Sequence, residues 1–299
     1  KVALIGLDWG TTSLRAYLIG ANGDVLSARY ENLGILNIEN QDFGSALRHV
    51  AGDWLHGDHI PPIIASGMIG SRQGWMEVPY GSLPAGPEQL TPAPFSGFDH
   101  PMYLIPGLAF RNAQGIPDVM RGEETQIAGL IDQSQADGVF VLPGSHSKWV
   151  VAKGGQITWF ATFMTGEIFA ALKDHTILGR MMAEGSNDDA FARGVELGHR
   201  TGAPLQSLFS ARTLALFGDL PEDGVASYLS GLLIGAEIAE ALELMDDAPA
   251  SVTIIGDPEL ARHYETALTI CGLASTRAPV DVAARGHWRI AKAAGLLAS

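Results

Sequence analysis

Ile5-Gly6-Leu7-Asp8-Trp9-Gly10-Thr11-Thr12-Ser13-Leu14-Arg15 is the stretch that decides the fold, because it joins two apolar strands through a short polar turn. Gly10 lets the backbone approach an anion closely, and Thr11, Thr12 and Ser13 offer hydroxyl and amide donors. Asp8 ends the first strand and can hold a hydrated Mg²⁺ ion. The pattern predicts a turn that binds the phosphates of a magnesium–nucleotide complex.

Two better-known phosphate loops are excluded by pattern. The dinucleotide loop GxGxxG and the Walker loop GxxxxGK[ST] both run from a strand into a helix, and neither pattern occurs in this chain. The DxGTTxxR hairpin instead resembles the first phosphate motif of the superfamily that contains sugar kinases, Hsp70 chaperones and actin. An ordinary hairpin turn is the alternative that composition alone favours.

The bulk properties narrow the class of protein. A length of 299 residues allows two domains with sizeable cores. A formal net charge of −14 opposes binding to nucleic acid or to an anionic membrane, so local positive charge must receive any anionic substrate. The single cysteine, Cys271, fits a reducing compartment. Without a leader-type pattern or an uncharged apolar stretch of membrane length, we expect a cytoplasmic protein.

The order of expected elements suggests two halves built on one plan. Strands are expected at 2–7, 14–19, 25–30, 63–65, 103–105, 138–142, 148–153, 156–163 and 252–255. Helices are expected at 43–55, 122–134, 167–178, 188–199, 205–217, 224–245, 259–271 and 283–297. The segment 78–101 is too rich in proline and glycine for regular structure, and 106–117 looks like a connection between domains.

A second turn follows the strand at 138–142. It comes after the first strand of the second half of the chain, as the Gly10 turn comes after the first strand of the first half. It contains Gly144, Ser145, His146, Ser147 and Lys148, whose amides, hydroxyls and ammonium group could face the β- and γ-phosphates. A hydrolase elbow, GxSxG, is excluded because Lys148 stands where the second glycine is required.

Phosphoryl transfer also needs a carboxylate near the acceptor hydroxyl. Glu123 and Glu124 lie at an expected helix N-terminus, where the helix dipole favours the ionised form, and Asp118 lies just upstream. Successive helical residues point about 100° apart, so at most one of the two glutamates easily faces the acceptor. The choice among the three carboxylates stays open, as does a purely stabilising role for the glutamates.

The motifs LDWGTTSLR, ASGMIGSRQGW, DVMRGEETQIAGL, VLPGSHSKWVV, FMTGEIFAALKDHTILG and VTIIGDPELARHYETAL closely resemble the 2-dehydro-3-deoxygalactonokinase family, over essentially the whole chain. The resemblance implies an ATP- and Mg²⁺-dependent kinase that phosphorylates the 6-hydroxyl of 2-keto-3-deoxygalactonate in galactonate breakdown. By analogy with glycerol and xylulose kinases, it points to Glu123 as the base. The same analogy assigns Gly256 to the adenosine motif, and Ser66 and Met68 to the sugar-binding segment.

The substrate implied by this resemblance carries one carboxylate, which an acidic protein must receive with a cation. Arg72, flanked by Ser71 and Gln73 in the loop after a buried strand, is the expected partner. Thr165 and Glu167 either line the substrate site or cap the helix that they begin.

These observations predict an α/β protein with two ribonuclease H-like domains of the actin/Hsp70/sugar-kinase ATPase fold and a cleft between them. Residues 1–108 would form the N-terminal domain and residues 109–299 the C-terminal domain, with the last helix packing back on the former. Mg·ATP would be held between the two turns. A kinase for another sugar acid or polyol, a non-kinase ATPase module and a homodimer remain to be tested.

Overall fold

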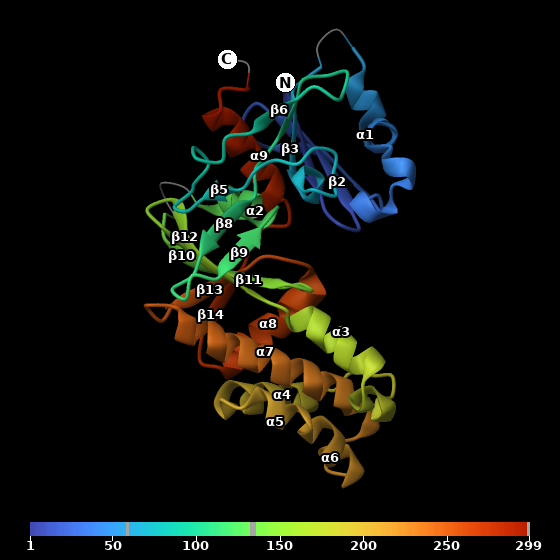
Figure 1. Cartoon of the computed structure of the whole chain (residues 1–299), viewed down its shortest axis with the longest axis vertical. Helices are drawn as coiled ribbons and strands as arrows, with labels where there is room; N and C mark the ends of the chain where they lie inside the picture. The colour runs from blue at the N-terminus through green and yellow to red at the C-terminus, as the bar shows by residue number, and fades with distance from the viewer. Residues whose placement is uncertain (58–59, 132–135, 298–299) are drawn as a thin grey trace. The chain divides into compact units, whose positions relative to one another are not determined.

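The structure, a computed structural model, describes residues 1–57, 60–131 and 136–297. The chain divides into two compact units. Unit 1 comprises residues 1–137, 151–159 and 279–299, and unit 2 comprises residues 138–150 and 160–278. Figure 1 labels the helices and strands of both. The predicted division into an N-terminal domain of residues 1–108 and a C-terminal domain of residues 109–299 stays a prediction.

Unit 1 contains a six-stranded sheet with the strand order β3-β2-β1-β4-β7-β6. Its strands are β1 (Val2–Trp9), β2 (Leu14–Gly20), β3 (Val25–Glu31), β4 (Ile63–Gly67), β6 (Ala93–Phe95) and β7 (Met102–Leu104). β1 pairs with β2 in antiparallel and with β4 in parallel orientation. The first three predicted strands are confirmed and form an antiparallel meander, and the fourth, predicted at 63–65, pairs with the first.

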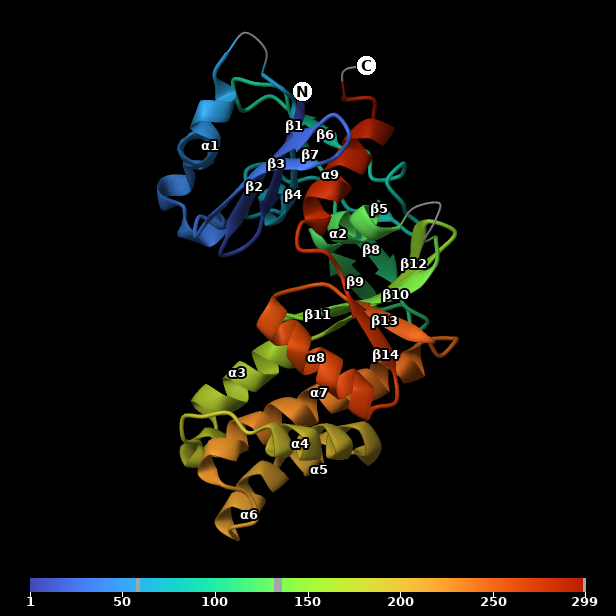
Figure 2. The same cartoon turned by 180° about the vertical axis from the view of Figure 1, so that it is seen from behind.

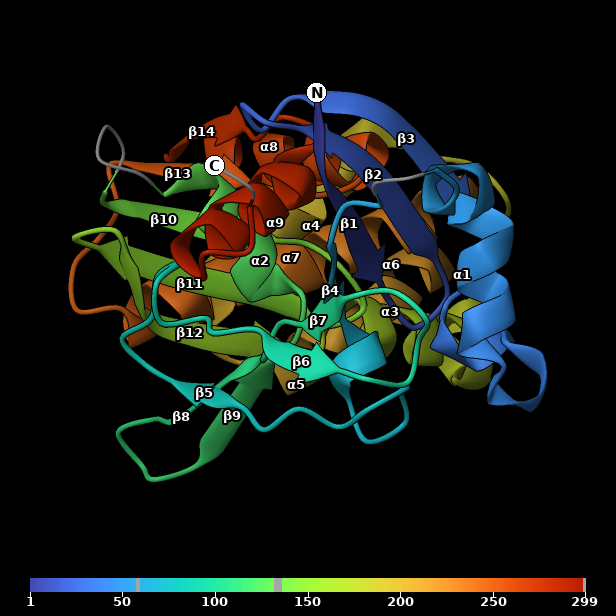
Figure 3. The ribbon, with the colours of Figure 1, turned by 90° about the horizontal axis from the view of Figure 1, so that it is seen from above.

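The two faces of this sheet have different partners, because successive side chains of a strand point to opposite faces. On one face, Ile5, Leu7 and Trp9 pack in a core with α1 (Phe43–Ala51). On the other face, a Cβ added to Gly6 would lie 2.7 Å from the His287 ring of α9 (Val282–Ala293). Figure 3 shows α1 on one side and α9 with α2 (Glu123–Leu130) on the other. Asp8 shares the face of Gly6.

Three expectations for unit 1 need correction. The segment 106–117 is no bare connection, because β8 (Leu108–Arg111) and β9 (Pro117–Met120) form a hairpin in a small sheet with β5 (Gly81–Ser82). The segment 78–101 also contains strands, β5 and β6, which are too short to show a pattern in sequence. The helix expected to reach residue 134 has its last turn at Leu130, and 132–135 lie outside the described residues.

A five-stranded sheet provides most of the strands of unit 2, with the order β12-β11-β10-β13-β14. Its strands are β10 (Gly138–Leu142), β11 (Ser147–Lys153), β12 (Gln156–Phe163), β13 (Ser251–Ile254) and β14 (Ala274–Arg277). The sequence shows 252–255 as the last clear strand, and the structure adds β14 after it. β14 reads Ala-Ser-Thr-Arg, without apolar alternation, because it is an edge strand that is largely exposed. Figure 2 shows it beside β13 and α8 (Pro258–Ile270).

The remaining helices of unit 2 are α3 (Thr165–His175), α4 (Asp188–Thr201), α5 (Pro204–Leu208), α6 (Ser210–Leu216) and α7 (Val225–Leu244). The helix expected at 205–217 is thus divided in two. α4 and α7 lie side by side (Figure 1), and four glycines at their crossing allow the backbones to approach closely: Gly194, Gly198, Gly231 and Gly235. By length and composition the stretch Glu222–Leu244 could cross a membrane, but 56% of its most apolar window is buried, as in a core helix.

Candidate active site

The first turn, between β1 and β2, is held through its carbonyl oxygens. Its carbonyl oxygens accept hydrogen bonds from the following segment: Ile35 N donates to Gly10 O (3.0 Å) and Leu36 N to Thr11 O (3.1 Å). Asn37 Nδ2 donates to Thr12 O at 3.0 Å. Within the described parts of the chain, the amides of residues 11–13 have no hydrogen-bond acceptor. A turn with occupied carbonyls and available amides fits the oxygens of a phosphate group.

Gly34 makes this support possible, although sequence reasoning missed it. A Cβ at this position would lie 2.2 Å from the carbonyl carbon of Thr12 and 2.4 Å from the amide nitrogen of Ser13. Its backbone, with φ −63° and ψ 165°, is open to any residue, so the requirement for glycine is purely one of space. Glycine is common in polar segments, and no signal in the sequence distinguishes this one from the rest.

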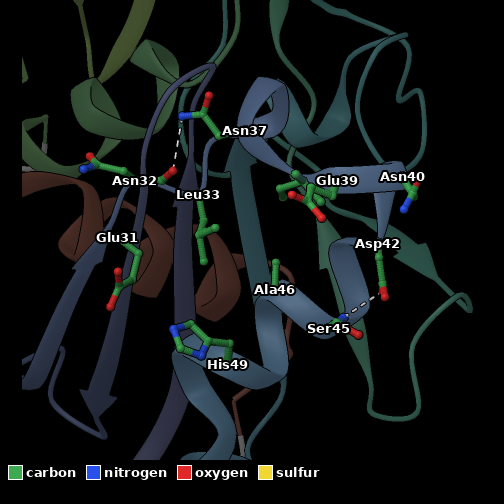
Figure 4. A pocket seen from close by; sticks show the side chains of 11 residues that line it. Glu31, Asn32, Leu33, Asn37, Glu39, Asn40, Asp42, Ser45, Ala46 and His49 are labelled. Atoms are coloured by element: carbon green, nitrogen blue, oxygen red, sulfur yellow. Dashed lines mark hydrogen bonds between the residues drawn. The ribbon is translucent and has the colours of Figure 1, made fainter.

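The segment that supports the turn also borders a cavity of about 590 Å³ (Figure 4). Asn37 connects the two features, because its side-chain amide also donates to Asn32 O at 3.2 Å. The cavity is lined mainly by polar side chains, including Glu31, Glu39 and Asp42. Three carboxylates repel an anion, so this cavity does not suit the carboxylate of a sugar acid.

Asp8 lies where β1 ends and pairs in register with Arg15 of β2 and with Ser66 of β4. Burial raises the pKa of Asp8 to about 6; the Arg15 charge opposes this shift and the Glu123 charge adds to it. Asp8 and Glu123 therefore lie close enough to repel each other when both are ionised. A divalent cation would relieve this repulsion, so the residues fit Mg²⁺.

The residues around Asp8 also suit magnesium better than a metal whose ligands all come from protein side chains. No group of three or more His, Cys, Asp or Glu side chains that could hold a metal is found among the described residues. Magnesium commonly takes one or two carboxylates and completes its shell with water and substrate phosphates. Asp8 is the residue that would hold it here.

Two glycines bring the N-terminus of α2 to the ends of β1 and β4. Gly67, with φ +92°, would place a Cβ 2.7 Å from the carbonyl oxygen of Trp9. Gly122, with φ +113°, would place a Cβ 3.3 Å from the Cα atom of Gly67. Both combine a left-handed backbone with a close approach, which only glycine tolerates without strain. As a result, Glu123 and Glu124 begin a helix directly beside Asp8.

The structure separates the three candidate bases. Glu124 is fully buried and accepts from Gly122 N at 2.7 Å and from Thr125 Oγ1 at 3.2 Å. Burial, reinforced by the Glu123 charge, raises the pKa of Glu124 to about 8, so it is mostly protonated at neutral pH. Glu123 is only half-buried, with Oε2 accepting from Arg121 N at 3.0 Å. Asp118 lies on the β8–β9 hairpin and accepts from the Val119 amide.

The loop after β4 is held in place by a hydrogen bond within the loop and by packing on the core. Ser71 Oγ donates to Met68 O at 2.7 Å, and Met68 packs against the unit 1 core. Arg72 and Gln73 are exposed, and the structure assigns Arg72 no salt bridge among the described residues. Ser66 is buried instead, and its Oγ lies 2.9 Å from Nε2 of His287. The loop therefore offers one accessible cation, Arg72.

Arg121 is a second cation at this loop, which sequence reasoning also missed. Its guanidinium lies over the Tyr80 ring, 4.3 Å from the centroid, and donates to Val78 O at 2.9 Å. A Cβ on Gly70 would lie 3.1 Å from Arg121 Nη1. Nε and Nη1 are buried without an acceptor in the described chain. Arg121 thus supplies positive charge between the loop and Glu123.

The second turn, between β10 and β11, contains Gly144, Ser145 and His146, whereas Ser147 and Lys148, also expected there, are the first two residues of β11. Gly144 and Ser145 line a cavity, whereas Ser147 and Lys148 point into the protein: Lys148 Nζ donates to Thr162 Oγ1 at 2.8 Å. His146 pairs with Glu167 of α3. Gly166 allows α3 to approach, since a Cβ there would lie 2.5 Å from Gly144 O. Glu167 therefore contacts the second turn.

The cavity beside this turn has a volume of about 430 Å³ and is bounded by α3, α4, α7 and α8. Apolar and small polar side chains line it, among them Thr165, Phe169, Phe191, Ser227, Ser230, Ile234, Leu260, His263 and Tyr264. Gly256 precedes α8, whose first turn is capped by Asp257: Oδ1 accepts from Glu259 N at 2.9 Å. The size and lining suit a flat, largely apolar group such as a nucleobase with its sugar.

Comparison with known proteins agrees with these features. The family model described as 2-keto-3-deoxy-galactonokinase matches residues 8–290. A 2-dehydro-3-deoxygalactonokinase of Escherichia coli (strain K12) is 36% identical over 285 residues, which are 93% of this chain and 94% of that protein. A solved structure from Sinorhizobium meliloti, named as a candidate 2-dehydro-3-deoxygalactonokinase protein, is 33% identical with a TM-score of 0.87 and covers 97% of this chain and 98% of its own.

More distant structures identify the fold. The ligand-bound xylulose kinase of Lactobacillus acidophilus is 10% identical, has a TM-score of 0.54, and covers 98% of this chain and 90% of its own. This likeness confirms the predicted actin/Hsp70/sugar-kinase ATPase fold and is an argument about fold alone. The family match, the identity to the curated kinase and the full-length structural agreement together show that the chain belongs to the 2-keto-3-deoxy-galactonokinase family.

Proposed function

We propose that this chain transfers the γ-phosphoryl group of ATP to the 6-hydroxyl of 2-dehydro-3-deoxygalactonate. The observation that carries the proposal is the arrangement at the end of β1. A turn with available amides and a half-buried Glu123 beside Asp8 occur together there, in a chain of the galactonokinase family. Together they supply phosphate binding, a metal carboxylate and a base, which phosphoryl transfer requires.

Unit 2 binds the nucleoside part of ATP in this proposal. The base and ribose occupy the 430 Å³ cavity, with α8 on one side and α3 on the other. Gly256 lies two residues before α8 and forms the start of the adenosine motif. Gly144 and Ser145 line the same cavity, so the second turn borders the bound nucleoside. Lys148 and Ser147 support the turn from inside the protein, since both are buried and hydrogen-bonded.

Unit 1 performs the chemistry. Magnesium, when bound, supplies positive charge that offsets the charge developing on the transferred group. The amides of residues 11–13 bind phosphate oxygens, and Asp8 is the metal carboxylate. Glu123 accepts the proton of the 6-hydroxyl as the new O–P bond forms and the bond between the β–γ bridging oxygen and the γ-phosphorus breaks. Glu124, being buried and mostly protonated, keeps the α2 N-terminus in place.

The loop after β4 receives the sugar acid. Arg72 is its accessible cation and pairs with the substrate carboxylate, while Ser71 and Gln73 flank it. Arg121 adds positive charge behind the loop.

The enzyme works in the cytoplasm, and neither nucleic acid nor a membrane is its partner. Its assembly is a homodimer, which size-exclusion chromatography with light scattering would test.

A coupled assay of ADP release tests the proposed activity. The protein, ATP and Mg²⁺ are incubated with a panel of 2-keto-3-deoxy sugar acids and with simple polyols. The proposal expects the highest kcat/KM with 2-dehydro-3-deoxygalactonate. Higher kcat/KM with another member of the panel would reassign the substrate, and turnover of none, with ATP still bound, would remove the kinase activity altogether.

A further inference from the structure

Unit 2 contains a buried carboxylate that the proposed reaction does not use. Glu237 lies in the middle of α7 and is 3% exposed. Trp149 Nε1 donates to its Oε1 at 2.8 Å, and the Tyr264 hydroxyl donates to its Oε2 at 2.7 Å. The Tyr264 oxygen also lies 2.9 Å from Ser147 Oγ. Glu237 is therefore the centre of a buried hydrogen-bond network.

The donors of this network come from the elements around the nucleoside cavity. Ser147 and Trp149 begin β11, directly after the second turn, and Tyr264 belongs to α8. Thr165, the first residue of α3, also hydrogen-bonds to Glu237. Tyr264 and Thr165 line the cavity themselves. One carboxylate thus connects the second turn with two walls of the cavity.

Burying a carboxylate at this position costs free energy that an apolar side chain would not cost. Burial raises the pKa of Glu237, and the hydrogen bonds from Thr165, Tyr264, Trp149 and Ser147 oppose that shift. Replacing a buried ionic or polar network by apolar side chains of similar volume is often neutral or stabilising. Since the other buried residues of α7 are apolar apart from Tyr228, stability alone does not call for glutamate here.

We propose that Glu237 is a positioning residue for the nucleotide: its carboxylate fixes Tyr264 and Thr165 in the cavity wall and Ser147 at the base of the second turn. This inference rests on the proposed function, in which unit 2 binds ATP. It assigns Glu237 to nucleotide binding and gives it no contact with the reacting atoms. Replacing Glu237 should therefore lower the affinity for ATP and leave the affinity for the sugar acid unchanged.

The test compares Glu237→Gln with Glu240→Gln, which changes the same residue type at an exposed position one turn further along α7. The amide introduced by Glu237→Gln has one accepting oxygen, so either the Trp149 indole or the Tyr264 hydroxyl loses its acceptor. Leaving one of these buried donors without its acceptor predicts a rise on the order of 10- to 100-fold in KM for ATP and in the Kd for ADP. KM for the sugar acid and kcat at saturating ATP should change little, and Glu240→Gln should match the wild type.

Two further measurements decide the result if Glu237→Gln does not fold. Tyr264→Phe removes only the hydroxyl between Ser147 and Glu237, and should also weaken ADP binding in calorimetry. In the wild type, addition of ADP should shift the Trp149 indole N–H resonance, assigned by its loss in Trp149→Phe. Folded variants with wild-type Kd for ADP would overturn the inference. Because this Kd does not depend on turnover, a wild type that binds ADP but phosphorylates no sugar acid would refute the proposed function alone.

Discussion

Replacing Gly34 with alanine tests whether the first turn does the phosphate binding. The new Cβ would lie 2.2 Å from the Thr12 carbonyl carbon, whereas real Cβ atoms essentially never come closer than 3.0 Å. The turn or its supporting segment must therefore move by at least 0.8 Å, the difference between 3.0 and 2.2 Å. The neighbour is backbone, so no side-chain rotation relieves the overlap. A displacement of about 1 Å in a positioning group lowers the rate roughly 100-fold.

The assay is coupled ADP release with ATP varied at saturating sugar acid. Gly52→Ala is the matched control, because a Cβ there meets nothing within 4 Å and the backbone is helical with φ −50°. We expect Gly34→Ala to lose about 100-fold in kcat/KM for ATP and Gly52→Ala to keep wild-type kinetics. Thermal unfolding of both variants separates misplacement from unfolding. Wild-type kinetics in a folded Gly34→Ala protein would refute the role of the turn.

Three other substitutions test the remaining assignments. Glu123→Gln should lower kcat by about 10²- to 10⁴-fold with ATP binding retained in calorimetry; near-normal turnover would return the base to Glu124 or Asp118. Arg72→Ala should mainly raise KM for the sugar acid in the same assay, and an unchanged KM would remove Arg72 from the carboxylate site. Glu124→Gln should flatten the pH dependence of stability. The pKa of Glu124 rises from 4.5 to about 8 on folding, so the folded wild type binds the proton more tightly and loses up to about 4 kcal/mol as pH rises through this window. Urea unfolding at pH 5 and pH 8.5 measures this loss, and equal losses in both proteins would contradict the assignment.

The sequence predicted those parts of the structure that depend on local chemistry. The hairpin at Gly10 and the turn at Gly144 carry residue types that few other local structures favour, and both lie between strands as expected. Asp42 caps α1 through the Ser45 amide at 3.0 Å, a contact between residues three positions apart. These features depend only on residues within a few positions along the chain, so they can be predicted from the sequence.

The sequence could not show features that depend on distant partners. Gly34 is required because Thr12 lies against it, and Glu237 matters because Trp149 and Tyr264 reach it from two other elements. β14 is a strand because β13 pairs with it, and its own composition is uninformative. Arg121 stands beside two glutamates in the sequence with no local sign of its position, because its partners, the Tyr80 ring and Val78 O, come from a distant segment.

The central claim is transfer of phosphate from ATP to one hydroxyl of one sugar acid, and NMR of the reaction product tests it most directly. After incubation of the protein with ATP, Mg²⁺ and 2-dehydro-3-deoxygalactonate, we expect a phosphorus resonance coupled to the protons on carbon 6, with ADP formed in equal amount. ADP release without a phosphorylated sugar acid, or phosphate on another hydroxyl, would contradict the claim.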